Sequence, residues 1–322
     1  MRGTPNMKPT TTTPVHGCMR EQRIDCGEYI MIHLYPVRSL SDKKTRQKKH
    51  RTTREVQKKL NEKNSRRKLS ALIHTNFTPG DLEITLTYDN EHCPETIDTA
   101  EHEREKAIRR FRRLWSDVTG EPETCFKYVE VLERGNKGRL HHHVIMSGGL
   151  NREQIRKKWG NGTVRVNHLR FDECGIEELV KYLTKCSERL RYKHWSQSRN
   201  LDKPCIEVSD DRIRREDAHH INSNPLDYNY IQNLYPGYTV SPYSVETTAN
   251  DEIQLAPFVS FMLYKTNNRY FRRDEYGRLY LPPEFTDIRK TNLKTNSAKQ
   301  KPSPAKRKRP RGNAAVPVPP VQ

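Results

Sequence analysis

Apolar and polar positions follow a regular pattern between about residues 80 and 205. Residues 82–88 alternate strictly and are rich in β-branched side chains, which predicts a half-buried strand. Apolar positions three and four apart between residues 97 and 118 predict an amphipathic helix. Residues 126–133 and 139–146 then predict two strands joined by a turn over residues 134–138.

The same pattern continues beyond this hairpin. Asn151, a good N-cap, and Gly160, a good stop signal, predict a short helix between them. Residues 163–167 predict another strand, and residues 176–186 predict a helix that carries Tyr182. The sequence therefore predicts an α+β fold, with a central antiparallel sheet of about five strands and helices on one face. The other face of the sheet would be left open for a site.

The chain before this core is less regular. Residues 1–25 are polar and rich in Thr and Pro, so we expect a disordered N-terminus there and a folded domain over residues 26–285. Within that domain, residues 28–35 predict a first strand, and residues 54–73 predict a charged helix with a thin apolar stripe.

The chain after this core is also weakly patterned. Residues 206–285 form a less certain β-rich extension, with strands expected at residues 235–240 and 258–263. Residues 286–322 are rich in Lys, Arg, Pro and Ala without periodicity, and predict a basic, Pro-containing disordered tail.

The charge balance points to a polyanionic partner. The chain has 322 residues, of which 59 are Lys or Arg and 40 are Asp or Glu, for a net charge of +19. Thirteen basic and three acidic residues lie between positions 41 and 72, and ten basic residues with no acidic one lie between positions 289 and 311. These two stretches account for the whole net charge, so we expect two basic arms that attract phosphates around a near-neutral body.

Several classes of protein are disfavoured by what the sequence lacks. Its seven cysteines are scattered without a C-x-x-C pair, which argues against a disulfide framework or a zinc knuckle. No apolar run approaches the length of a membrane span or of the apolar part of a signal peptide. We therefore expect a cytoplasmic protein that does not bind a membrane. No G-x-x-x-x-G-K-[ST] loop is present, so we expect no nucleotide cofactor and no fused helicase.

Three consecutive histidines in the strand at residues 139–146 are the first candidate for chemistry. Alternate side chains of a strand share a face, so His141 and His143 point one way and His142 points the other, with the core residues. Two imidazoles separated by one residue can bind Mn²⁺, Mg²⁺ or Zn²⁺, with a carboxylate as the expected third ligand. A structural or DNA-facing histidine cluster is the alternative.

Two carboxylates compete for the third position. Glu133 and Glu130 lie on the preceding strand with opposite parity, so only one of them can share the face of His141 and His143. Glu133 is the first choice, and the sequence alone does not fix the register.

Tyr182 and Lys185 are the second candidate. On a helical projection Tyr182 falls at the edge of the apolar stripe, with Lys185 one turn further along. A tyrosine can act as a nucleophile toward phosphorus. A core-edge tyrosine beside a solvated lysine is the alternative.

Taken in order, these motifs resemble a known family. Residues 84–88 (ITLTY), Glu133 with residues 138–143 (GRLHHH), and residues 182–185 (YLTK) resemble the three motifs of the HUH rolling-circle replication initiators. The similarity is greatest to replication-associated proteins of bacterial phages and mobile elements, of the filamentous-phage gene II type. It extends roughly over residues 29–238.

The resemblance implies a relative of the RNA-recognition fold whose central strand holds two metal-binding histidines. His141, His143 and Glu133 would bind Mg²⁺ or Mn²⁺, and Tyr182 would attack a phosphate of origin DNA. The products would be a 5′-phosphotyrosine link and a free 3′-hydroxyl, with Lys185 supporting the tyrosine or the phosphate electrostatically.

The resemblance also implies partners. Single-stranded origin DNA would be the substrate, with a host helicase and a host DNA polymerase as partners in the cytoplasm of a bacterial cell. We expect DNA contacts from basic residues around the histidine hairpin, in the motif at residues 195–201 and in the tail: Lys137, Arg139, Arg199, Lys306, Arg307, Lys308 and Arg309.

Some features depart from the family pattern or leave rivals open. His142 stands where a bulky apolar residue is more usual. Glu178 and Cys186 lie four positions before and after Tyr182, which favours a single-tyrosine enzyme, although Tyr192 is a possible second nucleophile. The rivals are a single-tyrosine transposase or relaxase, and a non-catalytic DNA-binding protein. The tyrosine follows the histidines here and Lys185 replaces the usual transposase glutamine, so a replication initiator is favoured.

Overall fold

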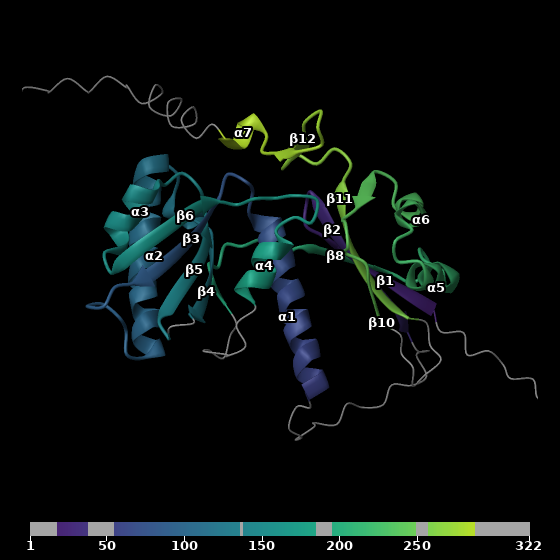
Figure 1. The fold of residues 1–322 in the computed structure, drawn as a ribbon, viewed down its shortest axis with the longest axis horizontal. Coiled ribbons are helices and arrows are strands. Elements are labelled where there is room, and N and C mark those ends of the chain that lie inside the picture. The colour runs from purple at the N-terminus through teal and green to yellow at the C-terminus, as the bar shows by residue number, and fades with distance from the viewer. Residues whose placement is uncertain (1–17, 38–54, 136–137, 185–194, 249–256, 287–322) are drawn as a thin grey trace, which may run out of the picture. The chain divides into compact units, whose positions relative to one another are not determined.

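A computed structural model describes residues 18–37, 55–135, 138–184, 195–248 and 257–286 of the chain (Figure 1). Every described residue lies in one compact unit, which ends at Thr286. None of the helices in the described ranges is both long enough and apolar enough to cross a membrane.

A five-stranded antiparallel sheet forms the centre of the best-patterned region. The strand order is β6-β3-β5-β4-β7, so the histidine strand β5 is central. The predicted α+β class with an antiparallel sheet of about five strands is confirmed. The strands are β3 (Leu82–Tyr88), β4 (Tyr128–Arg134), β5 (Leu140–Met146), β6 (Gly162–His168) and β7 (Ser196–Gln197).

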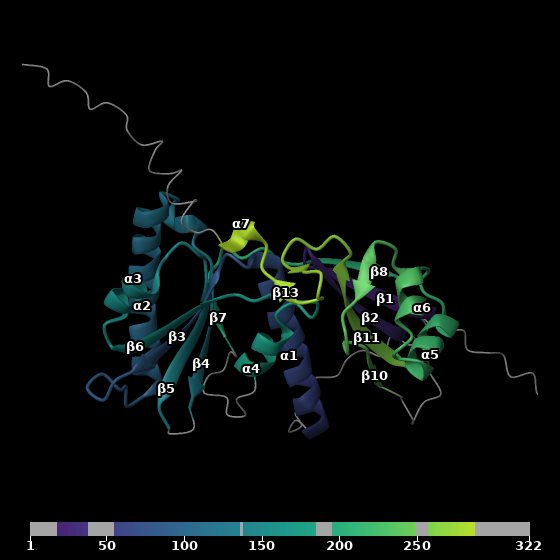
Figure 2. The same ribbon diagram turned by 45° about the horizontal axis from the view of Figure 1, so that its top comes forward.

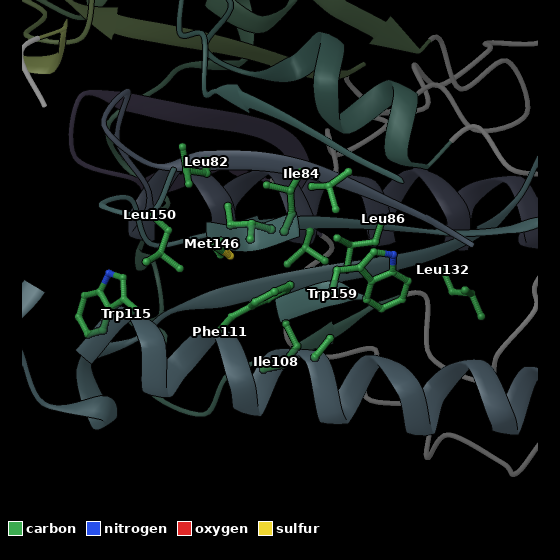
Figure 3. Packing of buried hydrophobic residues seen from close by; sticks show 14 of the residues in the cluster. Leu82, Ile84, Leu86, Ile108, Phe111, Trp115, Leu132, Met146, Leu150 and Trp159 are labelled. Atoms are coloured by element: carbon green, nitrogen blue, oxygen red, sulfur yellow. The ribbon is translucent and has the colours of Figure 1, made fainter. Parts of the chain in front are cut away.

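One face of this sheet packs against α2 (Ile97–Thr119) and α3 (Arg152–Trp159), as the spacing of apolar residues predicts (Figure 3). Thr96 caps the start of α2 through the backbone N–H of Thr99, and Gly120 ends that helix in the left-handed region. Asn151 is the N-cap of α3 as predicted and forms a capping box with Gln154, and Gly160 ends the helix.

The other face of the sheet is not left open as the sequence predicted. Helices α1 (Glu55–Asn76) and α4 (Glu177–Leu183) share a second apolar cluster with Val129, Val131 and Ile145 of that face. The sequence did not reveal this cover because the apolar stripe of α1 is short and surrounded by charge. In the structure, Leu69 and Ile73 of α1 and Phe77, which follows the helix, are nevertheless fully buried. The part of the face formed by β3 and β6 keeps exposed polar side chains, among them Thr163, Arg165 and Asn167.

The N-terminal strands and the C-terminal region together build a second sheet of six strands (Figure 2). Its order is β10-β11-β2-β1-β8, with β9 paired to β11, and α5 (Arg215–Ser223) and α6 (Tyr228–Leu234) share its apolar cluster. The strands are β1 (Cys18–Asp25), β2 (Tyr29–Val37), β8 (Cys205–Ser209), β9 (Tyr238–Val240), β10 (Glu246–Thr248) and β11 (Phe258–Lys265).

Short elements complete the described chain. The strands β12 (Arg272–Arg273) and β13 (Leu279–Tyr280) form a hairpin of their own. The turn η2 (Glu123–Cys125) precedes β4, and α7 (Pro283–Thr286) ends the described residues.

Strand β1 corrects the expectation that disorder extends to residue 25. The strand is polar, and its charged side chains find partners across the second sheet. Arg20 donates two hydrogen bonds to Asp210, at 2.6 and 2.7 Å. Glu21 is buried and accepts a 2.6 Å hydrogen bond from the hydroxyl of Tyr235. Sequence composition could not reveal partners about 190 and 214 positions away.

Candidate active site

The three histidines divide between the two faces of the sheet as strand parity predicts. His141 and His143 lie on the face that also carries Ile145, toward α1 and α4. His142 is fully buried on the opposite face, against Tyr88 and Trp159. The triplet therefore supplies two side chains to a candidate site and one to the core.

Threonines of β3 orient the two imidazoles on the site face. The antiparallel register places Thr87 opposite His141 and Thr85 opposite His143. Oγ1 of Thr87 lies 3.0 Å from Nδ1 of His141, and Oγ1 of Thr85 lies 3.4 Å from Nδ1 of His143. Both contacts use Nδ1, so Nε2 is the ring nitrogen left to interact with other groups.

Burial lowers the pKa of His141, and the neighbouring charge of His143 lowers it further. The imidazole of His141 is therefore neutral at physiological pH, the form that can bind a metal ion. Gly135 lies close to this ring, because a Cβ at Gly135 would stand 2.6 Å from Nε2 of His141.

The register of the hairpin separates the two candidate carboxylates. Glu133 lies on the site face, where its Oε2 is 2.7 Å from Nε2 of His143. Glu130 lies on the other face and is fully buried, with its Oε1 2.7 Å from Nδ1 of His142. Glu133 is thus the carboxylate that lies beside the histidine pair.

His142 belongs to a buried polar network. The hydroxyl of Tyr88 lies 2.8 Å from Nε2 of His142. On the other side of the ring, Nδ1 of His142 lies 2.7 Å from Oε1 of Glu130. Arg104 of α2 stands 3.7 Å from Oε2 of Glu130 and donates a 2.8 Å hydrogen bond to Ser196 of β7. A histidine at this position therefore joins β3, β4 and, through Glu130 and Arg104, α2 and β7.

Tyr182 lies beside the histidine pair, near the end of α4. Its ring meets the ring of His143 edge-on, with the centroids 5.3 Å apart and the planes at 88°. Half of its surface is exposed, in agreement with its predicted place at the edge of the apolar stripe. Burial raises the pKa of the phenol, as do the charges of Glu133 and Glu83, whereas Arg165 lowers it. The phenol is therefore protonated at neutral pH.

The donor types on this face fit a divalent cation. Imidazoles bind first-row divalent ions and carboxylates suit Mg²⁺ and Mn²⁺, so the donors of His141, His143 and Glu133 are compatible with a divalent cation. Among the described residues, however, no three His, Cys, Asp or Glu side chains are already grouped as a metal site. Instead, the carboxylate of Glu133 accepts a hydrogen bond from Nε2 of His143. This hydrogen bond would have to break for both side chains to bind the same ion.

The remaining predicted residues divide into two groups. Arg139 and Arg199 are exposed, and Arg139 donates a hydrogen bond to Asn90. The others lie outside the described residues: Lys137, Lys185, Tyr192, Cys186, Lys306, Arg307, Lys308 and Arg309.

Sequence reasoning missed Arg165. This residue lies on β6 opposite Thr85, on the exposed part of the site face, and its charge acts on Tyr182. The alternation of residues 163–167 showed that Arg165 points away from Val164 and Val166. It did not show that Arg165 lies on the face of His141 and His143, because the pairing of β6 with β3 was unknown.

Residues 81–187 match the family model of replication-associated proteins of the ORF2 and gene II protein type. The matched segment contains β3, the β4–β5 hairpin and α4, and therefore every side chain of the candidate site described above. The match confirms the resemblance drawn from the three motifs. A comparison with curated proteins found no match.

Proposed function

We propose that this protein is a replication initiator that nicks single-stranded DNA at an origin, with Tyr182 as the nucleophile, and so primes rolling-circle replication. The observation that carries the proposal is the contact between the half-exposed ring of Tyr182 and His143. Tyr182 and the histidine pair come from elements about forty positions apart in sequence, and the fold brings them onto one face.

The proposed reaction exchanges one phosphodiester for another. The phenolic oxygen of Tyr182 forms a bond to phosphorus, and the bond from phosphorus to the 3′ oxygen breaks. The phenol loses its proton and the 3′ oxygen gains one, so the products are a 5′-phosphotyrosine and a free 3′-hydroxyl. Because the bond types are conserved, the step can run backwards, which allows the strand to be rejoined after replication.

His141, His143 and Glu133 are proposed to hold Mg²⁺ or Mn²⁺, which would act as a Lewis acid on the scissile phosphate. The threonines of β3 keep both imidazoles oriented through Nδ1. Neutral His141 is in the form that such a site needs at physiological pH.

The DNA strand is proposed to approach over the exposed part of the sheet. Arg165 stands there beside Tyr182, and Arg139 and Arg199 are exposed elsewhere on the same domain. Helix α1 adds exposed lysines in its first half, and Lys306 to Arg309 of the tail would add sequence-independent attraction to phosphates. A host DNA polymerase would extend the 3′-hydroxyl, and a host helicase would supply the unwinding.

The experiment is a search for a covalent protein–DNA adduct. Overlapping single-stranded oligonucleotides are made that cover the non-coding DNA around the gene for this protein. They are incubated with the protein and Mn²⁺, and the products are resolved on a denaturing gel. We expect one oligonucleotide to give an adduct and a shorter fragment with a 3′-hydroxyl. Tyr182→Phe should give none, whereas Tyr276→Phe, which removes the hydroxyl of another exposed tyrosine, should react normally.

The histidine pair has its own test. Replacing His141 and His143 together by Ala should abolish cleavage and leave salt-sensitive DNA binding intact, because the phosphate contacts lie elsewhere. No adduct with any oligonucleotide, or an adduct that persists in Tyr182→Phe, would overturn the proposed function.

A further inference from the structure

Helix α4 is too short to be stable alone. It spans seven residues, Glu177–Leu183, and Ile176 at its N-cap makes no side-chain capping hydrogen bond. Isolated helices of this length do not form in water, so packing and contacts from other elements must fix its position. Tyr182 lies in its last turn, and its placement against His143 depends on those contacts.

Those contacts come from one stripe of α1, which lies beside α4 in both views of the fold (Figures 1 and 2). Arg66, Ser70 and His74 are spaced four residues apart, so their side chains lie along one face of the helix. Each one contacts a different point of α4 or its ends.

The start of α4 is held at two of these points. The backbone N–H of Ile176 donates to Nε2 of His74 at 3.2 Å, while Nδ1 of His74 lies 2.9 Å from the carbonyl oxygen of Ser70. The hydroxyl of Ser70 also donates to the carboxylate of Glu177 in the first turn. The fully buried His74 thereby replaces the missing N-terminal cap of α4.

The end of α4 is held at the third point. Nε of Arg66 donates a 3.1 Å hydrogen bond to the hydroxyl of Thr184, two residues beyond Tyr182. The guanidinium also stands at the C-terminal end of the helix, where a positive charge is favourable.

Gly175 shows how closely α1 approaches this region. It adopts a φ of +63°, and a Cβ at this position would overlap Nε2 of His74. Glycine is therefore required here both for the backbone conformation and for the approach of the imidazole.

Helix α1 is itself held by contacts to the second sheet. Lys63 lies 2.7 Å and Arg67 lies 2.9 Å from Oε2 of Glu246 on β10, and Arg67 also donates a 2.7 Å hydrogen bond to Ser260 on β11. The second sheet thus fixes α1, and α1 in turn holds α4 at both ends.

We propose that Arg66, Ser70 and His74 are positioning residues, which set the place of the Tyr182 hydroxyl through α4 and so control the rate of DNA cleavage. The inference rests on the proposed function. It assigns to the basic helix α1 a role beyond attraction of DNA, because these three side chains contact the nucleophile helix from inside the fold.

The test is a double-mutant cycle on the pair that can be changed with least damage. Ser70→Ala removes the donor of the hydrogen bond between α1 and the first turn of α4, and Glu177→Met removes its acceptor while keeping an unbranched side chain of similar length. We expect the single-turnover rate of adduct formation to fall by about tenfold to 100-fold in each, since small misplacements of a reacting group have effects of this size. Affinity for the oligonucleotide, measured without Mn²⁺, should be unchanged.

The double variant should be no slower than the worse single variant, because both changes remove the same contact. Ser65→Ala, a serine on the same helix outside the stripe, is the matched control and should cleave at the wild-type rate. His74→Phe keeps an aromatic ring between Tyr29 and Phe171 but removes the acceptor for Ile176, and should slow cleavage in the same way.

Three outcomes overturn the inference. The first is an unchanged rate in Ser70→Ala and Glu177→Met while wild-type protein forms the adduct. The second is additive losses in the double variant. The third is a loss explained by weaker DNA binding. Absence of an adduct in the wild-type protein overturns instead the proposed function, and the positioning role with it.

Discussion

Replacing His142 by Leu should destabilise the fold while leaving the chemistry of the folded protein intact. The imidazole is fully buried between Tyr88 and Glu130, at 2.8 and 2.7 Å, and it shares no face with His141 or His143. Leucine fills most of the space of the imidazole. The main loss of stability therefore comes from the missing hydrogen bonds and not from a cavity.

The magnitude follows from the contacts. A hydrogen bond to a charged group contributes about 1.5–3 kcal/mol and a neutral one about 1 kcal/mol. Removing the imidazole takes one hydrogen-bond partner from two buried groups, the Tyr88 hydroxyl and the Glu130 carboxylate, which costs about 1–3 kcal/mol for a neutral group and more for a charged one. Arg104 remains 3.7 Å from Glu130, which offsets part of this cost, so we expect a loss of about 3 kcal/mol in the free energy of unfolding.

Urea denaturation followed by tryptophan fluorescence measures the loss, since Trp159 lies beside His142 with ring centroids 6.2 Å apart. The variant His142→Leu with Glu130→Gln should regain part of the stability, because a neutral amide costs less to bury than a carboxylate that has lost one hydrogen-bond donor. Wild-type stability in His142→Leu would refute the reasoning. A cleavage rate that falls far more than the folded fraction would show that His142 takes part in the chemistry.

Three further predictions test other parts of the molecule. Gly135→Ala should slow cleavage by about tenfold or more by displacing the His141 ring, whereas Gly80→Ala, which has ordinary contacts, should not; equal rates refute this. Arg165→Ala should reduce the slope of log binding constant against log salt by about 1, and an unchanged slope would exclude a phosphate contact. Burial lowers the pKa of His33 from 6.5 to about 4, so the unfolded state binds more protons between these values and stability falls as pH decreases. At pH 5 the loss is about 2 kcal/mol, and His33→Phe should remove it in urea titrations at pH 5 and pH 7.

The central sheet and its side-chain parity could be predicted because they depend on local pattern. Alternation along residues 82–88 and 140–146 set the faces of β3 and β5, and helical spacing set the exposure of Tyr182. The division of His142 from His141 and His143 needed no knowledge of the rest of the fold.

The partners of those side chains could not be predicted, because they depend on register and on distant elements. The sequence favours Glu133 over Glu130, but only the pairing of Glu133 with His141 fixes which of the two lies on the site face. Likewise, the polar strand β1 has partners for its charges in Asp210 and Tyr235, which are far away in sequence. The stripe on α1 gave no apolar signal, since its members are Arg66, Ser70 and His74.

The histidine strand and α1 each carry neighbouring residues that have different tasks. On β5 a step of one residue separates the candidate ligands from a buried network that joins β3, β4 and α2. On α1 one stripe holds α4, while Lys63 and Arg67 contact the second sheet. Substitutions at adjacent positions should therefore affect different measured quantities. Losses at His142 should appear in unfolding, whereas losses at His141 or Ser70 should appear in the rate of cleavage.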